Sequence, residues 1–169
     1  MNKLFLMLLI FTGIFASSCK KEIVQNHIYD NVIYLLDDVP IYSSALEKTK
    51  KKTNEQFLTI LYADLFNQAI SSNQLAEMAL LISAVGDKLM IRELIISSFM
   101  NAGSVSLPTD SDMRNNVDDF VTDTYIKFFV RLPNEYERYY LTNLIDEDLD
   151  LSPELIYTSF ALSTEYLYY

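Results

Sequence analysis

The segment TNEQFLTILYADLF at residues 53–66 decides the fold class of this chain. Thr53 and Gln56 have the spacing of a capping box, in which each side chain bonds the other residue's backbone N–H at a helix start. Apolar residues then recur at three- and four-residue intervals, as on one face of an amphipathic helix: Phe57, Leu58, Leu61, Tyr62, Leu65 and Phe66. The segment therefore predicts a helix that buries one face in a core.

Two further helices are predicted before the middle of the chain. Ser71 and Gln74 have the spacing of a second capping box, and an apolar stripe follows them. Asp87 is a favourable N-cap for a third helix at about residues 88–101, which Gly103 is placed to end.

Helical signals return after an interval at residues 104–116, which we interpret as an acidic loop. Apolar residues at helical spacing recur in residues 117–129, and Asn134 and Glu137 provide a third capping-box spacing. The run Ser152-Pro153-Glu154 combines a serine N-cap, a proline at the first helical position and an acid in the first turn. Three more helices are therefore expected.

The two sets of predicted helices resemble each other. The matches, at offsets of 63, 63 and 61, are residues 57–66 with 120–129, the caps at 71–74 with 134–137, and ELIISSF at 93–99 with ELIYTSF at 154–160. They predict a duplicated unit, with half-repeats at about residues 53–103 and 116–169 that pack with a pseudo-twofold relation. The similarity of any two amphipathic helices is the alternative explanation.

Composition favours the same fold class. The chain has only three glycines and four prolines, fewer turn residues than many short strands need. Half of the residues are hydrophobic, and residues 30–169 are enough for a single domain with a core. We therefore predict an all-α bundle of about six helices, built from two similar three-helix halves.

The first nineteen residues have the layout of a secretory signal. Lys3 precedes an apolar run at residues 4–15, and the small residues Ala16-Ser17-Ser18 stand directly before Cys19. The run is too short to span a bilayer of about 30 Å as a helix. A plain signal peptide with a chance cysteine and an uncleaved membrane anchor are the alternatives.

This segment resembles the signal of bacterial lipoproteins, in which Ala16-Ser17-Ser18-Cys19 corresponds to the lipobox. The resemblance implies that the signal peptide, residues 1–18, is removed, that Cys19 is acylated through its sulfur, and that residues 19–29 form a lipidated tether. Several acyl chains hold a protein at a membrane without further contacts. Lys20-Lys21-Glu22 gives no clear inner-membrane retention signal by analogy with known sorting, so we expect the outer membrane.

The chain is acidic, with a net charge of −10 that becomes −11 when Lys3 leaves with the signal. Nucleic acid is therefore a poor partner, because an acidic surface repels its phosphates. The one basic cluster consists of Lys48, Lys50, Lys51 and Lys52. We expect a solvated helix face or loop there, with a patch for an acidic partner as the alternative.

Residue types of the common catalytic centres are scarce. His27 is the only histidine and lies in the tether, and the only cysteine, Cys19, is committed to lipid. Ser-His and Cys-His catalysis and zinc sites of the usual composition are therefore excluded. The sequence has no glycine-rich phosphate loop. We expect no cofactor, no metal site and no catalytic residue.

Carboxylates are plentiful, and two acidic groups are candidates for a weak cation site. The run from Asp146 to Asp150 begins like a calcium loop, but Leu151 and Tyr157 stand where an EF-hand needs glycine and glutamate. The second group consists of Asp110, Asp112, Asp118 and Asp119. A solvated loop is the favoured interpretation of both. Sequence alone does not show the separation that a glycosidase carboxylate pair needs.

A second resemblance spans residues 120–166 and rests on Tyr125, Arg131, Pro133, Glu137 and the run Ser163-Thr-Glu165-Tyr166. This pattern is similar to a helical unit of phycobilisome linker domains and of secreted domains of uncharacterised function. The resemblance implies a role in protein–protein assembly and no ligand site. The first half departs from it, with Gln68 and Ile70 at the positions of the arginine and the proline.

Tyrosines crowd the C-terminal third, and tyrosine is enriched at interface hot spots. We therefore expect Tyr166, Tyr168 and Tyr169 to form a partner surface, and deletion of residues 166–169 to abolish partner binding without unfolding the domain. The favoured function is a non-enzymatic, lipid-anchored interaction or adaptor subunit of a bacterial membrane complex, with an envelope protein as partner. The alternative is a carboxylate-dependent envelope enzyme that acts on glycan or peptidoglycan.

Overall fold

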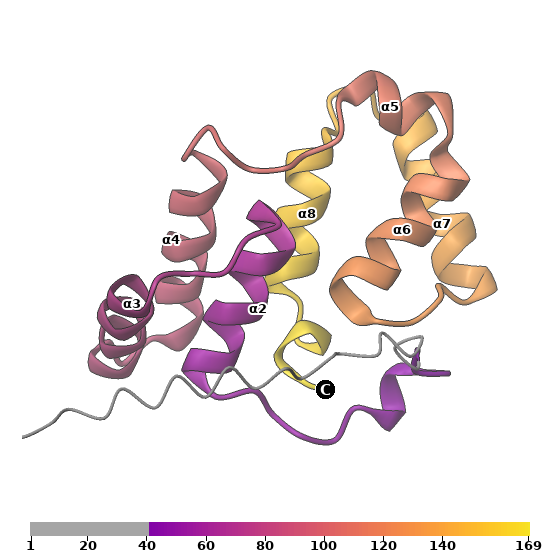
Figure 1. The fold of residues 1–169 in the computed structure, drawn as a ribbon. Helices are drawn as coiled ribbons and strands as arrows, with labels where there is room; N and C mark the ends of the chain where they lie inside the picture. The colour runs from indigo at the N-terminus through magenta and orange to yellow at the C-terminus, as the bar shows by residue number, and fades with distance from the viewer. Residues whose placement is uncertain (1–40) are drawn as a thin grey trace, which may run out of the picture. The chain divides into compact units, whose positions relative to one another are not determined.

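The computed structural model describes residues 41–169, so the expectations for the signal peptide, Cys19, the tether and His27 lie outside the described residues. Within this range the chain forms seven α-helices and two short 3-10 helices, with no strand beyond two isolated backbone bridges (Figure 1). The prediction of an all-α fold is confirmed. None of the helices in residues 41–169 combines the length and the hydrophobicity that a membrane span requires.

The first three helices are α2 (Asn54–Phe66), α3 (Ser72–Ala84) and α4 (Lys88–Met100). Their starts follow the predicted caps. Thr53 and Gln56 exchange side chain–backbone hydrogen bonds of 2.9 and 3.2 Å, and Asp87 Oδ1 accepts two backbone N–H groups at 3.0 Å. Because α2 packs against both α3 and α4, the apolar face predicted for residues 53–66 is buried.

A short helix, α5 (Asp110–Asn115), occupies part of the interval expected to be a loop, and for these residues that expectation was wrong. Thr109 and Asp112 form a capping box with hydrogen bonds of 3.0 and 3.1 Å. Met113 is fully buried, which fixes this turn against the core. A single apolar residue gives no helical period, so only the Thr-x-x-Asp spacing signalled this helix.

The second set consists of α6 (Val117–Phe129), α7 (Glu135–Glu147) and α8 (Pro153–Leu162), followed by the 3-10 helix η3 (Glu165–Leu167). Asn134 and Glu137 form the predicted capping box, and Ser152 Oγ accepts the Leu155 N–H at 3.3 Å. α6 packs against α7 and α8, while α8 also packs against α4 (Figure 1). The two sets of three helices therefore meet along α4 and α8.

The two sets share details beyond their order. α2, α3, α6 and α7 each have 13 residues. α2 and α6 both end at a residue in the left-handed conformation, Asn67 and Val130, each with φ of 52°. In the similar ELI strings, residues 95–96 of α4 and 156–157 of α8 are buried at matching positions. These similarities agree with a duplication, which stays a prediction.

Aromatic rings fill the core where α2, α6 and α8 meet. The ring centroid of Phe128 lies 5.0 to 6.0 Å from those of Tyr157, Phe160 and Tyr166. Phe57 of α2 packs edge-on against Tyr166 at 5.9 Å. Tyr166 therefore connects helices from both sets.

The segment before α2 contains the 3-10 helix η2 (Ala45–Glu47) and runs along the last residues of the chain. Lys50 and Tyr169 exchange backbone hydrogen bonds of 2.9 and 3.1 Å, and the Lys52 N–H donates to the Leu167 carbonyl at 2.8 Å. This pairing brings the predicted basic cluster against the C-terminal tyrosines.

Candidate functional site

Arg131 is a buried and extensively bonded charged side chain at the end of α6. It follows the left-handed Val130 at the end of the helix and is only 4% exposed. Its Nε and Nη2 donate to Glu165 at 2.7 and 2.8 Å, and its Nη1 and Nη2 donate to Glu137 at 2.7 and 2.8 Å. The planar guanidinium suits bidentate pairing with two carboxylates at once, which a lysine could not reproduce.

Lys48 completes a group that we name the Arg131 cluster: Lys48, Arg131, Glu137 and Glu165. Lys48 Nζ lies 3.0 Å from Glu165 Oε1, and only 3% of the side chain is exposed. The expectation of a solvated lysine was wrong here, because the segment before α2 lies against Glu165 and the ring of Phe129, 5.2 Å from Nζ. Lys50 and Lys51 are exposed as expected, whereas Lys52 is half-buried.

The cluster keeps its carboxylates ionised. Hydrogen bonds from Arg131 hold the pKa of Glu137 below its usual value. Burial alone raises the pKa of Glu165, but the bonds from Arg131 and Lys48 outweigh burial and leave that pKa lowered. The bonds to Glu137 and Glu165 in turn raise the pKa of Arg131. At neutral pH neither carboxylate holds a proton to donate, so neither suits the role of general acid.

Several residues of the second resemblance meet in this cluster. The Arg131 guanidinium carbon lies 5.0 Å from the ring centroid of Tyr125, and Glu137 accepts the Asn134 N–H at 2.9 Å as well as the arginine. The short spacing from Arg131 to Glu137 thus joins the ion pair to the start of α7. Kinship with the linker domains stays a prediction.

The C-terminal tyrosines differ in their placement. Tyr166 is 0% exposed, and its hydroxyl donates to Asp64 Oδ2 at 2.6 Å. Its expected place in a partner surface was therefore wrong, because both ring and hydroxyl are used inside the domain. Deletion of residues 166–169 would also remove a core side chain, so it cannot leave the fold intact. Tyr168 and Tyr169 are half-buried, and their role in partner binding stays a prediction.

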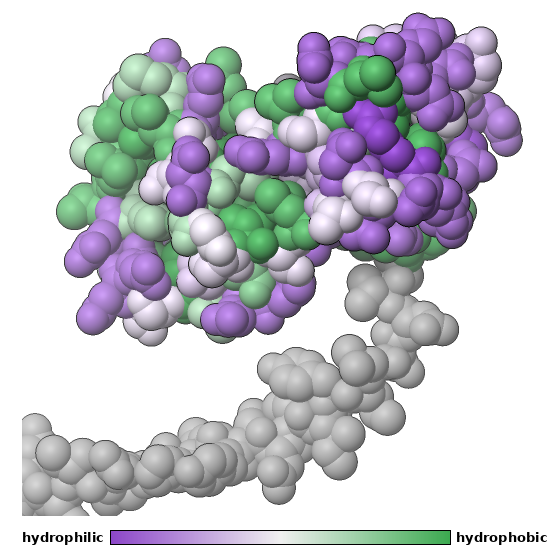
Figure 2. Space-filling view, turned by 90° about the horizontal axis from the view of Figure 1, so that it is seen from above, coloured by the Kyte–Doolittle hydropathy of each residue, from purple (hydrophilic) through white to green (hydrophobic). Residues whose placement is uncertain are grey.

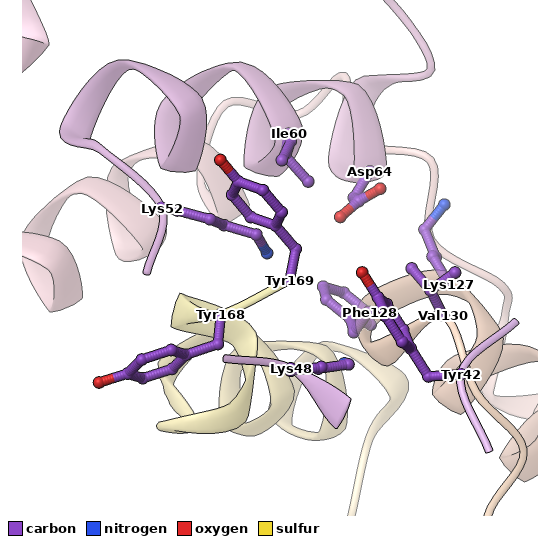
Figure 3. A pocket seen from close by; sticks show the side chains of 10 residues that line it. All are labelled: Tyr42, Lys48, Lys52, Ile60, Asp64, Lys127, Phe128, Val130, Tyr168 and Tyr169. Carbon is purple, nitrogen blue, oxygen red and sulfur yellow. The ribbon is translucent and has the colours of Figure 1, made fainter. Parts of the chain in front are cut away.

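A pocket of about 310 Å³ lies beside the cluster, between α2, the end of α6 and the C-terminal residues (Figure 3). We name it the Lys52 pocket; its charged lining residues are Lys48, Lys52, Asp64 and Lys127. The Tyr42 N–H donates to the Val130 carbonyl at 2.8 Å, which closes the pocket on one side. The charges of three separate segments thus converge on one hollow.

Burial perturbs the two inner charges of the Lys52 pocket. It lowers the pKa of Lys52 to about 8, although nearby Asp64 acts against this shift. Burial raises the pKa of Asp64, although the Tyr166 hydroxyl, Lys127 and Lys52 oppose it. Asp64 is the only side-chain carboxylate among the described residues that line the pocket. The pocket therefore lacks the paired carboxylates of glycoside hydrolysis.

The second acidic group considered for a cation, for which a solvated loop was favoured, is exposed but lies in α5 and α6 rather than in a loop. Asp110 pairs with Arg114 at 3.1 Å, and Asp118 lies 3.5 Å from Arg138. In residues 41–169, no group of three or more His, Cys, Asp or Glu side chains is arranged to hold a metal ion. Arg114 also donates to carbonyls at the end of α7 and in the loop after it: those of Ile145, Asp148, Leu149 and Leu151.

Large apolar side chains are exposed on α3 and α4. We define the α3–α4 apolar surface as five residues that are 46% to 71% exposed: Leu80, Leu81, Leu89, Met90 and Leu94. In Figure 2, hydrophobic surface gathers over the α3 and α4 side of the described domain, whereas the α5 to α7 side is mainly hydrophilic. The sequence carried a signal for this surface, because apolar residues in both helices extend beyond one face.

A second exposed group lies on α7. Tyr136, Tyr139 and Tyr140 are all exposed, and the rings of Tyr136 and Tyr140 stack at 6.2 Å. The tyrosines that the structure makes available to a partner are therefore on α7 rather than at position 166.

Comparisons with known proteins add no relative: no family model, curated protein or solved structure matches the chain. The geometry of the described residues is therefore the basis for a functional proposal.

Proposed function

We propose that this chain is a lipid-anchored protein of the bacterial envelope that acts as a non-enzymatic interaction subunit of a membrane complex. The α3–α4 apolar surface is the observation that carries the proposal. Contiguous exposed apolar patches mark interaction sites on otherwise soluble domains. Covering such a patch gains roughly 25 cal/mol per Å² of apolar area removed from water.

The lipobox resemblance supplies the location in this proposal. Cys19 is the acylated residue, the following tether holds the domain near the bilayer, and the outer membrane is the expected membrane. Acyl anchoring removes the need for a membrane-binding face on the domain. The exposed apolar residues then remain available to a neighbouring envelope protein.

The enzyme alternative receives less support from the geometry. Glu137 and Glu165 are held ionised by Arg131, and Asp64 is the sole side-chain carboxylate among the described lining residues of the Lys52 pocket. Acid–base hydrolysis of a glycan needs two carboxylates in different protonation states beside one bond.

The test is a crosslinking pull-down of the lipidated protein from its native envelope, read by mass spectrometry. We expect one stoichiometric partner, captured by the wild type and lost in the double variant Leu80→Ser/Leu94→Ser. Both residues are exposed, so the fold is expected to survive, and circular dichroism checks this.

Leu149→Ser is the matched control, because Leu149 is 78% exposed but lies in the loop after α7. This variant should capture the partner as the wild type does. Equal capture by the α3–α4 double variant would contradict the proposal. Anchoring is tested separately with Cys19→Ala, which should release the chain from the membrane fraction.

A further inference from the structure

The Lys52 pocket has the size and walls of a small-ligand site. Its volume of about 310 Å³ lies at the lower end of the range for ligand pockets, which suits a ligand with a single ring. Phe128 and Tyr169 line it with aromatic rings. In Figure 3, the amine of Lys52, the carboxylate of Asp64 and the hydroxyl of Tyr42 turn toward the same space, while Tyr168 turns away.

Charge is unbalanced around this space. Three lysines and one aspartate line the pocket. Lys48 is neutralised by Glu165 within the Arg131 cluster, whose two cations balance its two carboxylates. Lys52 and Lys127 both attract Asp64, so these two cations share one carboxylate and one positive charge is left over. A single surplus cation stands out in a chain with a net charge of −10.

Hydrogen-bonding capacity also remains in the pocket. Lys52 Nζ donates to the Tyr166 carbonyl at 2.5 Å, and an ammonium group has two more protons to donate. Asp64 Oδ2 accepts the Tyr166 hydroxyl, and within the described chain Oδ1 has no hydrogen-bond partner. The pocket thus offers a cationic donor to an anion and a carboxylate acceptor to a hydroxyl group.

We propose that the Lys52 pocket binds a small hydroxylated monoanion of the sugar-acid class. The ligand carboxylate pairs with Lys52 and accepts from the Tyr42 hydroxyl. A ligand hydroxyl donates to Asp64 Oδ1, and the sugar ring packs against the aromatic wall. One surplus positive charge favours a monoanion over a neutral sugar or a zwitterion. This site is separate from the α3–α4 apolar surface and does not rest on the proposed function.

The test is isothermal titration calorimetry on the purified mature protein in detergent, with D-glucuronate as the probe at pH 7. D-glucose and acetate are the comparison ligands, because one lacks the charge and the other lacks the hydroxyl groups. We expect glucuronate to bind at least tenfold more tightly than either. Absence of glucuronate binding, or equal binding of glucose, would overturn the proposal.

Lys52→Met should weaken glucuronate binding at least tenfold, and Tyr42→Phe should weaken it severalfold. Lys51→Met is the matched control, because Lys51 is the exposed neighbour, and its affinity should not change. Unchanged affinity in a folded Lys52→Met protein would overturn the site. If that variant unfolds, Tyr42→Phe decides, and unchanged affinity there would also overturn it.

Titration with a disaccharide that ends in glucuronate separates two sources of the same chemistry. Binding of both probes supports recognition of a glycan terminus. Binding of the monosaccharide alone supports recognition of a free sugar acid. In both cases affinity should fall about tenfold between pH 7 and pH 9, because Lys52 loses its proton near pH 8. The charged and titratable groups that act on this amine are Lys48 and Asp64, and the Tyr166 carbonyl and ring lie against it.

Discussion

The two sets of helices, α2 to α4 and α6 to α8, share a framework but use it differently. α2 and α6 have equal length and end in the same left-handed turn. After that turn, Arg131 in the second set is buried between two carboxylates, whereas Gln68 in the first set is exposed. The two sets thus share the geometry of this turn, but the residue that follows it is ion-paired and buried in one set and solvated in the other.

The exposed surface differs in the same way. The first set leaves the α3–α4 apolar surface open to solvent. Long-range polar bonds fix parts of the second set: Arg131 bonds Glu165 after α8, and Arg114 of α5 bonds the loop between α7 and α8. We therefore expect loss of a polar side chain to cost more stability in the second set, whereas the proposed partner surface lies on the first set.

The largest expected effect comes from removing the centre of the Arg131 cluster. Arg131→Met should destabilise the domain by about 3–5 kcal/mol, because Glu137 and Glu165 lose the cation that pairs them. Gln68→Met, at the matching position of the first set, should change stability by less than about 0.5 kcal/mol. Urea unfolding of the three proteins measures both, and similar losses would contradict the distinction between the two sets.

Acid should weaken the domain through the Arg131 cluster. The pKa values of Glu137 and Glu165 are lowered on folding, so their stabilisation is present above their unfolded pKa and is lost as the pH falls through their folded pKa. The pKa of Asp64 is raised on folding, so its ionisation lowers the stability of the domain as the pH rises. Unfolding between pH 7 and pH 3 should show a smaller acid loss in Glu165→Gln than in the wild type; parallel curves would argue against this origin.

A medium effect is expected from the side chains that cap the second helix of each set. Arg114→Met removes bonds to four carbonyls and should cost about 1.5–3 kcal/mol. Lys88 donates to the carbonyls of Ile82, Ser83 and Val85 at 2.6 to 3.0 Å. However, Lys88 is exposed, and its partners lie close to it in the sequence. Lys88→Met should therefore cost less than about 1 kcal/mol. Thermal unfolding can rank them, and a reversed order would refute the comparison.

The smallest effect concerns the two left-handed residues. A branched residue in this conformation costs about 1–2 kcal/mol, whereas asparagine tolerates it. Val130→Asn should therefore stabilise the domain by about 1 kcal/mol, and Asn67→Val should destabilise it by a similar amount. Denaturant midpoints of the two single variants test the exchange. Changes of the same sign would show that side-chain packing, not backbone conformation, dominates at these turns.

Residue spacing was sufficient for most of the fold. The caps at Thr53, Ser71, Asp87, Asn134 and Ser152 all begin helices where they were expected. These signals succeed because a cap bonds backbone groups within three residues, and an apolar stripe needs only the helical period. The α5 helix was missed because its single buried residue, Met113, provides no period.

The candidate sites depended on contacts that spacing does not contain. Lys48 was expected in solvent and Tyr166 on a surface, yet both are buried, because residues 41–52 pair with the C-terminal segment. The sequence alone determined the helix starts, the acidic charge and the resemblance to a lipoprotein signal. The tertiary structure decided which lysines meet Glu165 and Asp64. Lys48 and Glu165, like Lys127 and Asp64, are more than 60 residues apart in the sequence. They meet only because the whole core packs and brings their elements together.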